Sequence, residues 1–395
     1  MSTRGNLTSR DRILTALKHK EPGYVPYDLG GTSITGIHSI AYQNLLHYLG
    51  KDHLLEKEEE AWYYEKLQGL AKIDEEIKQE LKVDTRGARF KNSSAWKFKI
   101  KEVEGRKTFT DELGCVWISS KDEYYFDQRP GESHPLVALI KIEDVENYSW
   151  PNPRDPARVR DLRTELKKIR EAGYAVIIEA PFNGIFSLGF RMRGYSNFYE
   201  DLGVNQSLAC RLMDKLTDLK INFWDMALEE IGDLVDIIVE LDDLGGQDAT
   251  LISPMMYRKL VKPRHKKLFS FIKKKASNSY LFFHSDGSLY NIMPDLIEVG
   301  VDILNPVQVS AAKMDSARLK REFGDSLSFW GGGVDTQNVL GKATPNEVRS
   351  EVKRRINDLA PGGGYIFTAI HNVQADVPPE NFMAMWEALQ DNKRY

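Results

Sequence analysis

Short apolar runs in this chain end in histidine and carboxylate residues, the pattern of polar side chains at the ends of buried strands. The run from Tyr280 to Phe283 stops at His284 and Asp286, which are two residues apart. If strand geometry persists for one more pair of residues, both side chains point to the same face of the sheet. An imidazole and a carboxylate at one point can bind a divalent metal or move a proton.

Other polar residues hold equivalent places at or after apolar runs. His371 follows the last run, and Glu240, Asp242 and Asp243 end the run that begins at Val235. The remaining candidate site residues are Asp28, Thr32, His38, Asp84, Arg86, Glu179, Asn305, Gln308, Trp330, Asp335 and Gln374. The two cysteines, Cys115 and Cys210, lie far apart and outside any CxxC pattern, so they predict neither a disulfide framework nor a thiolate metal site.

Imidazole and carboxylate are the metal ligands that this composition leaves, and we predict that His284, Asp286 and His371 bind a divalent metal. One of Glu240, Asp242 and Asp243 is the alternative carboxylate ligand. Each candidate carboxylate also has a structural alternative, because Asp and Glu side chains cap helix N-termini. For His371 the structural alternative is a hydrogen-bonded core histidine.

The elements that must position these residues alternate between strands and helices. Strands are predicted to begin near residues 25, 83, 174, 235, 280, 301, 327 and 365, and nearly all are followed by helical spacing. This pattern predicts an α/β fold of the (β/α)8, or TIM barrel, class, in which parallel strands bring their carboxyl ends to one edge. A doubly wound sheet is the alternative, but it would gather ligand groups at one switch point.

Two further segments have their own patterns. Residues 52–81 are predicted to be largely helical, with an aromatic cluster at Trp62, Tyr63 and Tyr64. Residues 92–135 alternate in the manner of an antiparallel meander, which we predict to be an insertion covering the site within a single domain of residues 1–395.

Composition excludes some classes of function. The chain has 395 residues, 42% of them apolar, and 54 basic against 58 acidic residues give a net charge of −4, so no electrostatic feature favours nucleic acid. The N-terminal residues lack the apolar core of a signal peptide, and no apolar run approaches the length of a membrane span. We therefore expect a cytoplasmic protein with a small-molecule or protein partner.

The chain resembles the uroporphyrinogen decarboxylase superfamily over nearly its whole length. The similar segments run from TSRDRILTALKHKEPGYVPYDLG near the N-terminus to HNVQADVPPENFMAMWEAL at the C-terminus, and the second is the more specific. The resemblance implies a (β/α)8 barrel. It also implies one of two activities: decarboxylation, or cobamide-dependent methyl transfer assisted by zinc.

The site segments favour the methyltransferase branch. Decarboxylases of the superfamily carry an arginine-rich segment, similar to MRQAGRY, that holds an acidic tetrapyrrole. This chain has DLGGTSITGIHSIAY there and no arginine between Tyr24 and Arg86, although His371 falls where the decarboxylases keep a histidine. The methyltransferases that act on thiols carry HxC and a later cysteine as zinc ligands, and this chain has His284, Ser285, Asp286 and His371 in those places.

The resemblance therefore implies a methyltransferase of the O-demethylase type. It would bind zinc through His284, Asp286 and His371, take a methyl group from a small methoxylated compound, and work with a corrinoid protein. Asp243 or Glu240 would be the catalytic acid. The substrate would be bound by Asp28, Thr32, His38, Asp84, Arg86, Glu179, Asn305, Gln308, Trp330 and Gln374. A homodimer is one candidate assembly. Trp62, Tyr63, Tyr64 and Trp330 would suit a methoxylated ring, with ordinary core aromatics as the alternative. The alternative functions are a decarboxylase-like lyase and a small-molecule-binding paralogue that needs no corrinoid.

Overall fold

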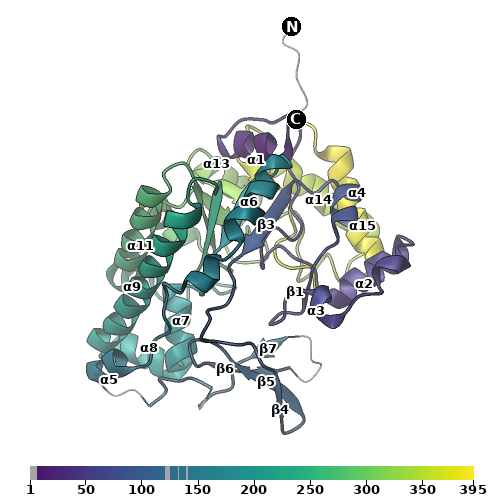
Figure 1. The fold of residues 1–395 in the computed structure, drawn as a ribbon. Helices are drawn as coiled ribbons and strands as arrows, with labels where there is room; N and C mark the ends of the chain where they lie inside the picture. Colours follow the sequence, from purple (N-terminus) through teal and green to yellow (C-terminus); the bar gives the residue numbers. More distant parts are fainter. Residues whose placement is uncertain (1–6, 121–124, 132, 139–140) are drawn as a thin grey trace.

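The computed structural model describes residues 7–120, 125–131, 133–138 and 141–395, and its centre is a curled parallel sheet (Figure 1). In the described chain this sheet has seven strands in the order β13-β12-β11-β10-β9-β8-β3. The strands are β3 (Thr85–Arg89), β8 (Ala175–Glu179), β9 (Ile237–Leu241), β10 (Tyr280–His284), β11 (Ile303–Asn305), β12 (Ser328–Trp330) and β13 (Tyr365–Ile366).

Residues 25–28 take the eighth place and close the sheet into a barrel. The Phe367 amide donates to Pro26 O at 2.9 Å, and the Asp28 amide donates to Phe367 O at 2.9 Å. On the other side, the Asp84 amide donates to Tyr27 O at 2.8 Å. The (β/α)8 barrel predicted from the sequence is therefore confirmed, with its first strand reduced to a bridge.

The barrel strands are almost wholly apolar because both of their faces are buried. Alternate residues such as Ile237, Val239 and Phe282 fill the barrel interior, while Ile238 and Phe283 pack outward against the helices. At the carboxyl ends of the strands, the same alternation decides which polar side chains face the barrel interior and which face the surrounding helices.

Helices cover the outside of the barrel and one of its ends (Figure 1). The α-helices are α1 (Ser9–Leu17), α2 (Ser39–Tyr48), α3 (Glu59–Trp62), α4 (Glu75–Glu80), α5 (Ile142–Asn147), α6 (Leu162–Glu171), α7 (Ile185–Arg193), α8 (Tyr195–Val204), α9 (Gln206–Ile231), α10 (Pro254–Met256), α11 (Lys262–Lys275), α12 (Met293–Glu298), α13 (Ser316–Phe323), α14 (Pro345–Leu359) and α15 (Pro379–Asn392). The start of α14 shows why such helices form where they do. Thr344 and Glu347 make a reciprocal capping box, with Pro345 at the first helical position. No helix in the described ranges is long and apolar enough to cross a membrane.

An antiparallel sheet lies across the end of the barrel opposite α1 (Figure 1). Its strands are β4 (Lys101–Val103), β5 (Arg106–Thr110), β6 (Val116–Ser119) and β7 (Phe126–Asp127), paired in sequence order. The meander expected over 92–135 also includes residues 121–124 and 132, which lie outside the described residues.

The helix expected over residues 52–81 is wrong. The segment is broken into a 3-10 turn η1 (Asp52–Leu54), α3, a hairpin of β1 (Tyr63–Glu65) and β2 (Leu70–Ala71), and α4. The Ser39 amide donates to Gly69 O, and the Ala71 amide donates to Ile37 O, both at 2.8 Å. Tertiary hydrogen bonds to Ile37 and to Ser39 at the start of α2 therefore replace the local helical ones.

Candidate functional site

Two imidazoles and a carboxylate meet at the carboxyl end of the barrel. His284 is the last residue of β10, Asp286 follows it, and His371 lies beyond β13. Each offers one ligand atom, and these atoms lie within 4.8 Å of one another. Asp286 Oδ2 is 3.9 Å from the Nε2 atoms of both histidines, and the ring centroids are 5.6 Å apart.

A buried amide fixes the orientation of the His284 ring. Asn305 Nδ2 donates to Trp330 O at 2.7 Å, which leaves its Oδ1 to accept from His284 Nδ1 at 2.6 Å. With the proton on Nδ1, the lone pair of His284 is on Nε2, the atom that faces Asp286. The predicted site residue Asn305 is thus a partner of a candidate ligand.

The site is buried on the side of His284 and open to solvent on the side of the other candidate residues. The His284 side chain is 5% exposed, whereas those of Asp243, Asp286 and His371 are 46%, 40% and 26% exposed. Desolvation by the surrounding chain lowers the pKa of His371, and the nearby Asp286 carboxylate opposes this effect. A neutral imidazole keeps its lone pair free for a metal.

The donor set fits a divalent metal. Two imidazole nitrogens and one carboxylate oxygen are common ligands of zinc sites that keep an open position. Asp243 Oδ1 lies 3.9 Å from His284 Nε2 and accepts from the Asp286 amide at 3.3 Å, so a second carboxylate is within reach of the same point.

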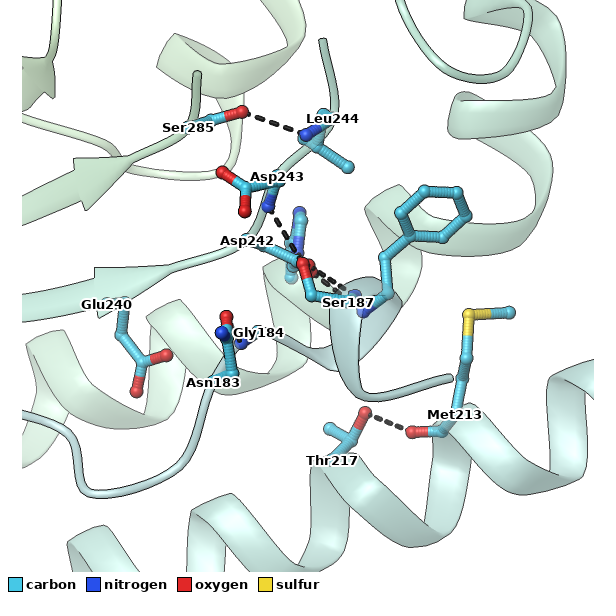
Figure 2. Close-up of polar contacts among 12 residues, drawn as sticks. Asn183, Gly184, Ser187, Met213, Thr217, Glu240, Asp242, Asp243, Leu244 and Ser285 are labelled. Atoms are coloured by element: carbon cyan, nitrogen blue, oxygen red, sulfur yellow. Dashed lines mark hydrogen bonds and ion pairs between the residues drawn. The ribbon is translucent and has the colours of Figure 1, made fainter. Parts of the chain in front are cut away.

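The loop that carries Asp243 is held by the first turn of α7. Asp242 accepts from the amides of Phe186 at 2.9 Å and Ser187 at 2.7 Å, which are donors left open at a helix N-terminus. The Ser187 hydroxyl donates to Asp242 Oδ1 at 2.8 Å and accepts from the Asp243 amide at 2.9 Å. Figure 2 shows Asp242 turned toward Ser187 and the Asp243 carboxylate turned away from it. Asp242 is therefore a helix cap, the structural alternative considered above.

Glu240 does not belong to the barrel mouth, which corrects its prediction as a catalytic acid. It alternates with the inward-facing Val239 and Leu241, so its side chain points outward to α9. There it is 1% exposed, forms a 2.9 Å ion pair with Lys220 and accepts from Trp224 Nε1 at 2.5 Å. Figure 2 shows its carboxylate on the helix side, away from that of Asp243.

Asp84 and Arg86 also lie away from the mouth, because β3 begins later than the sequence suggests. Asp84 precedes the strand and pairs with Arg12 of α1 at 3.0 Å, at the end of the barrel opposite His284. Arg86 is the second residue of β3, faces outward and pairs with Glu75 at 2.7 Å. The side chain at the carboxyl end of β3 belongs to Arg89, which sequence reasoning missed.

The remaining candidate site residues lie in the barrel interior, in loops, or at the barrel mouth. Asp28 is fully buried and accepts from Thr85 Oγ1 at 2.5 Å and Trp330 Nε1 at 2.8 Å; burial raises its pKa. Thr32 is buried beside Thr35, and His38 accepts from the Ile40 amide as the cap of α2.

Three candidates lie in or beside the loops of the mouth. Gln308 accepts from the Gly287 amide at 2.7 Å and Gln374 donates to Asn372 O at 3.0 Å, so both hold loops that carry candidate ligands. Glu179, at the end of β8, accepts from the Ser33 amide at 2.8 Å and faces a cavity. Asp335 instead caps its own loop by accepting from the Gln337 amide at 2.8 Å.

That cavity has a volume of about 770 Å³ and lies between the barrel mouth and the antiparallel sheet. The hairpin of β1 and β2 contributes Tyr63 and Tyr64, the barrel contributes Glu179 and Leu241, and the sheet contributes aromatic side chains. Leu241 is the direct strand neighbour of His284, so the cavity reaches to within one strand of the candidate ligands. Of the aromatic residues proposed from the sequence, Tyr63 and Tyr64 line it, whereas Trp330 is buried in the barrel interior.

Comparisons with known proteins agree with this architecture. Residues 127–391 match the family model described as uroporphyrinogen decarboxylase (URO-D). Uroporphyrinogen decarboxylase from Geobacter sulfurreducens is 24% identical over 274 residues, 66% of this chain and 72% of that protein. The enzyme of the same name from Psychromonas ingrahamii is 23% identical over 273 residues, with the same coverage. Among solved structures, a methyltransferase from Methanosarcina mazei has a TM-score of 0.65 at 17% identity, covering 98% of this chain and 99% of that chain.

Proposed function

The chain belongs to the uroporphyrinogen decarboxylase family, and we propose that within it the protein is a metal-dependent methyltransferase. It would take a methyl group from a small methoxylated compound and pass it to a reduced corrinoid on a partner protein. The observation that supports this most directly is the cluster of His284, Asp286 and His371 at an open barrel mouth. The fold shared with a solved methyltransferase is compatible with this function.

The ligand types favour an ether as methyl donor over a thiol as methyl acceptor. Thiolate ligands donate charge to a metal, whereas imidazole and carboxylate leave it a stronger Lewis acid. A divalent metal bound by His284, Asp286 and His371 would supply Lewis acidity toward the oxygen of the donor. Zinc is the metal that we propose for this set.

The chain's own residues orient the ligands and move a proton. The reaction breaks the bond between the methyl carbon and oxygen, whose electron pair stays on the oxygen, while the new bond to carbon uses an electron pair of the reduced corrinoid. The departing oxygen finally takes a proton. Asp243 is the group best placed to pass this proton on from solvent, because its carboxyl group is 46% exposed and lies 3.9 Å from His284 Nε2. Asn305 keeps His284 Nε2 directed into the mouth.

A decarboxylase-like lyase is the second candidate, because the two sequence relatives carry that name. The structure offers it little support at the first strand. The last residue of that strand is the buried acid Asp28, and the first arginine after Tyr24, Arg86, faces outward to Glu75. A carboxylate-rich substrate bound there would lose its hydration without gaining charged partners.

Purified enzyme mixed with reduced corrinoid protein and a panel of methoxy compounds tests the proposal. We expect the absorbance change of corrinoid methylation with at least one methoxy donor, and its loss in His284→Ala. Asp335→Asn, which alters a capping carboxylate outside the candidate cluster, is the matched control. Methyl transfer only from the methylated corrinoid to a thiol would reject the proposal.

A further inference from the structure

A buried histidine of α11 lies directly behind the acid of the barrel mouth. His265 is 1% exposed, and its Nε2 atom lies 2.9 Å from Asp242 Oδ2. Asp242 precedes Asp243 in the chain, and its amide continues the sheet by donating to His284 O at 2.9 Å. Side chains of neighbouring residues in such an extended segment point to opposite faces. A contact that holds Asp242 on the helix side therefore turns Asp243 toward the mouth (Figure 2).

In the described chain, the Asp242 carboxylate accepts four hydrogen bonds, which is about the capacity of its two oxygens. Three of them come from the first turn of α7, through the amides of Phe186 and Ser187 and the Ser187 hydroxyl. The fourth comes from His265, on a different helix. His265 is thus the contact that connects α11 to the loop that carries Asp243.

One neutral tautomer of His265 satisfies both of its ring nitrogens. The Asp242 carboxylate accepts, so Nε2 carries the hydrogen and Nδ1 has the lone pair. Nδ1 lies 3.2 Å from the hydroxyl of Tyr257, which is 1% exposed. Burial raises the pKa of Tyr257, so its hydroxyl keeps its proton and donates to Nδ1. The hydrogen bonds therefore run in one direction, from Tyr257 through His265 to Asp242.

The helix is interrupted where these hydrogen bonds begin. A π turn, η3 (Tyr257–Val261), lies between α10 and α11, and Pro263 lacks the amide that would donate to Lys259 O in a regular α-helix. Tyr257 and His265 are eight residues apart, a spacing at which side chains of a regular helix are turned by about 80° from one another. The extra residue of a π turn reduces this angle to about 20°, which brings the two side chains to one face. Such turns occur frequently at functional sites.

The ring of His265 also packs against the strand that carries a candidate metal ligand. It is stacked on Phe269 at 11°, with the centroids 5.1 Å apart, and it meets Phe283 edge-on at 5.5 Å. Phe283 immediately precedes His284 in β10. Packing alone is therefore the alternative reason for a histidine at this position.

We propose that His265 is a positioning residue of the mouth, which holds the Asp243 carboxylate toward the candidate metal ligands by donating to Asp242. The Ser187 hydroxyl connects the two acids, because it donates to Asp242 Oδ1 at 2.8 Å and accepts from the Asp243 amide at 2.9 Å. Asp243 in turn accepts from the Asp286 amide at 3.3 Å, so the same contacts reach a candidate ligand. The placement of Asp243 follows from these contacts, and only its use in passing on a proton rests on the proposed function.

Two substitutions separate the hydrogen bond from the packing. His265→Gln keeps an N–H donor near the position of Nε2 but loses the ring, whereas His265→Phe keeps a ring but has no donor. Hydrogen exchange followed by mass spectrometry should show peptides that contain residues 242–244 exchanging about ten-fold faster in His265→Phe, the effect of losing one hydrogen bond to a charged group. In His265→Gln these peptides should exchange at close to the wild-type rate. Faster exchange in His265→Gln than in His265→Phe would assign the residue to packing and overturn the proposal.

Thr217→Val is the matched control, because it removes a buried hydroxyl of α9 that donates to Met213 O at 2.7 Å, outside these hydrogen bonds (Figure 2). An equal rise in exchange of residues 242–244 in this control would show general destabilisation and contradict the proposal. With reduced corrinoid protein, His265→Phe should lower kcat about ten-fold at an unchanged KM for the methoxy donor, and His265→Gln should retain most of the activity. A wild-type kcat in His265→Phe would also overturn the proposal. If the wild-type protein methylates no corrinoid, the proposed function fails and the exchange rates alone decide the role of His265.

Discussion

Asn305 is the residue whose replacement should weaken metal binding without removing a ligand. Its side chain is fully buried, accepts from His284 Nδ1 at 2.6 Å and donates to Trp330 O at 2.7 Å. Asn305→Leu keeps the branch point of the side chain but leaves one buried donor and one buried acceptor without partners, at about 1–3 kcal/mol each. Loss of the orienting bond to a ligand should also weaken metal affinity about 10–100-fold.

The two effects can be separated by a matched variant. Asn381 in α15 is 3% exposed and donates to Leu340 O at 2.9 Å and Ala343 O at 2.8 Å, so Asn381→Leu also leaves two backbone acceptors without this donor, one of them buried and the other part-buried. Urea unfolding of the metal-free proteins should show both variants destabilised to a similar degree. Zinc affinity, measured by competition with a coloured chelator, should fall only in Asn305→Leu. Equal affinities in the two variants would refute the role of Asn305.

Three further outcomes follow from the structure. Protein purified without chelator should contain stoichiometric divalent metal, and His284→Ala combined with His371→Ala should remove it; metal that persists in the double variant contradicts the ligand assignment. Incubation with uroporphyrinogen should give no coproporphyrinogen at an enzymatic rate, because Arg86 is committed to Glu75. Burial lowers the pKa of Lys78 to about 8, from an ordinary value near 10.5, with the nearby Arg86 adding to the effect. Because the unfolded chain binds more protons between these two values, this residue makes stability rise with pH through that window. Lys78→Met should therefore stabilise the protein by about 1–3 kcal/mol at pH 7, with the gain fading by about pH 10.5; an equal gain at both pH values in urea unfolding would contradict this.

The barrel and the core of its site could be predicted from local sequence patterns. Runs such as Ala175–Glu179 and Ile237–Leu241 are apolar on both faces because parallel barrel strands are buried on both sides. The spacing of His284 and Asp286 follows the two-residue period of a strand, and the shared carboxyl edge of the strands predicted that His371 would join them.

Only the tertiary structure decided which neighbouring acid faces the site. Glu240, Asp242 and Asp243 lie within four residues of one another, and each meets a different environment. Glu240 contacts Lys220 and Trp224 on the helix side of the sheet. Asp242 accepts from the first turn of α7, and Asp243 faces the barrel mouth. A shift of one residue along a strand turns a side chain to the other face of the sheet. If the predicted strand bounds are wrong by one residue, a side chain expected in the site therefore faces the helices instead. The late start of β3, which moved Asp84 and Arg86 away from the mouth and brought Arg89 to it, has the same cause.

The cavity also depends on contacts that no local pattern contains. Residues 63–71 form a hairpin because their backbone partners outside it include Ile37 and Ser39, although their composition favours a helix. Aromatic residues of the antiparallel sheet such as Phe109 and Trp117 line the cavity because that sheet packs against the mouth, although they lie about a hundred residues or more from His284 and His371 in sequence. The sequence by itself therefore determined the (β/α)8 barrel and the triad of candidate ligands, since both follow the period of single strands. The acid beside the triad and the walls of the cavity were decided by tertiary packing, because they arise between segments that are remote in the chain.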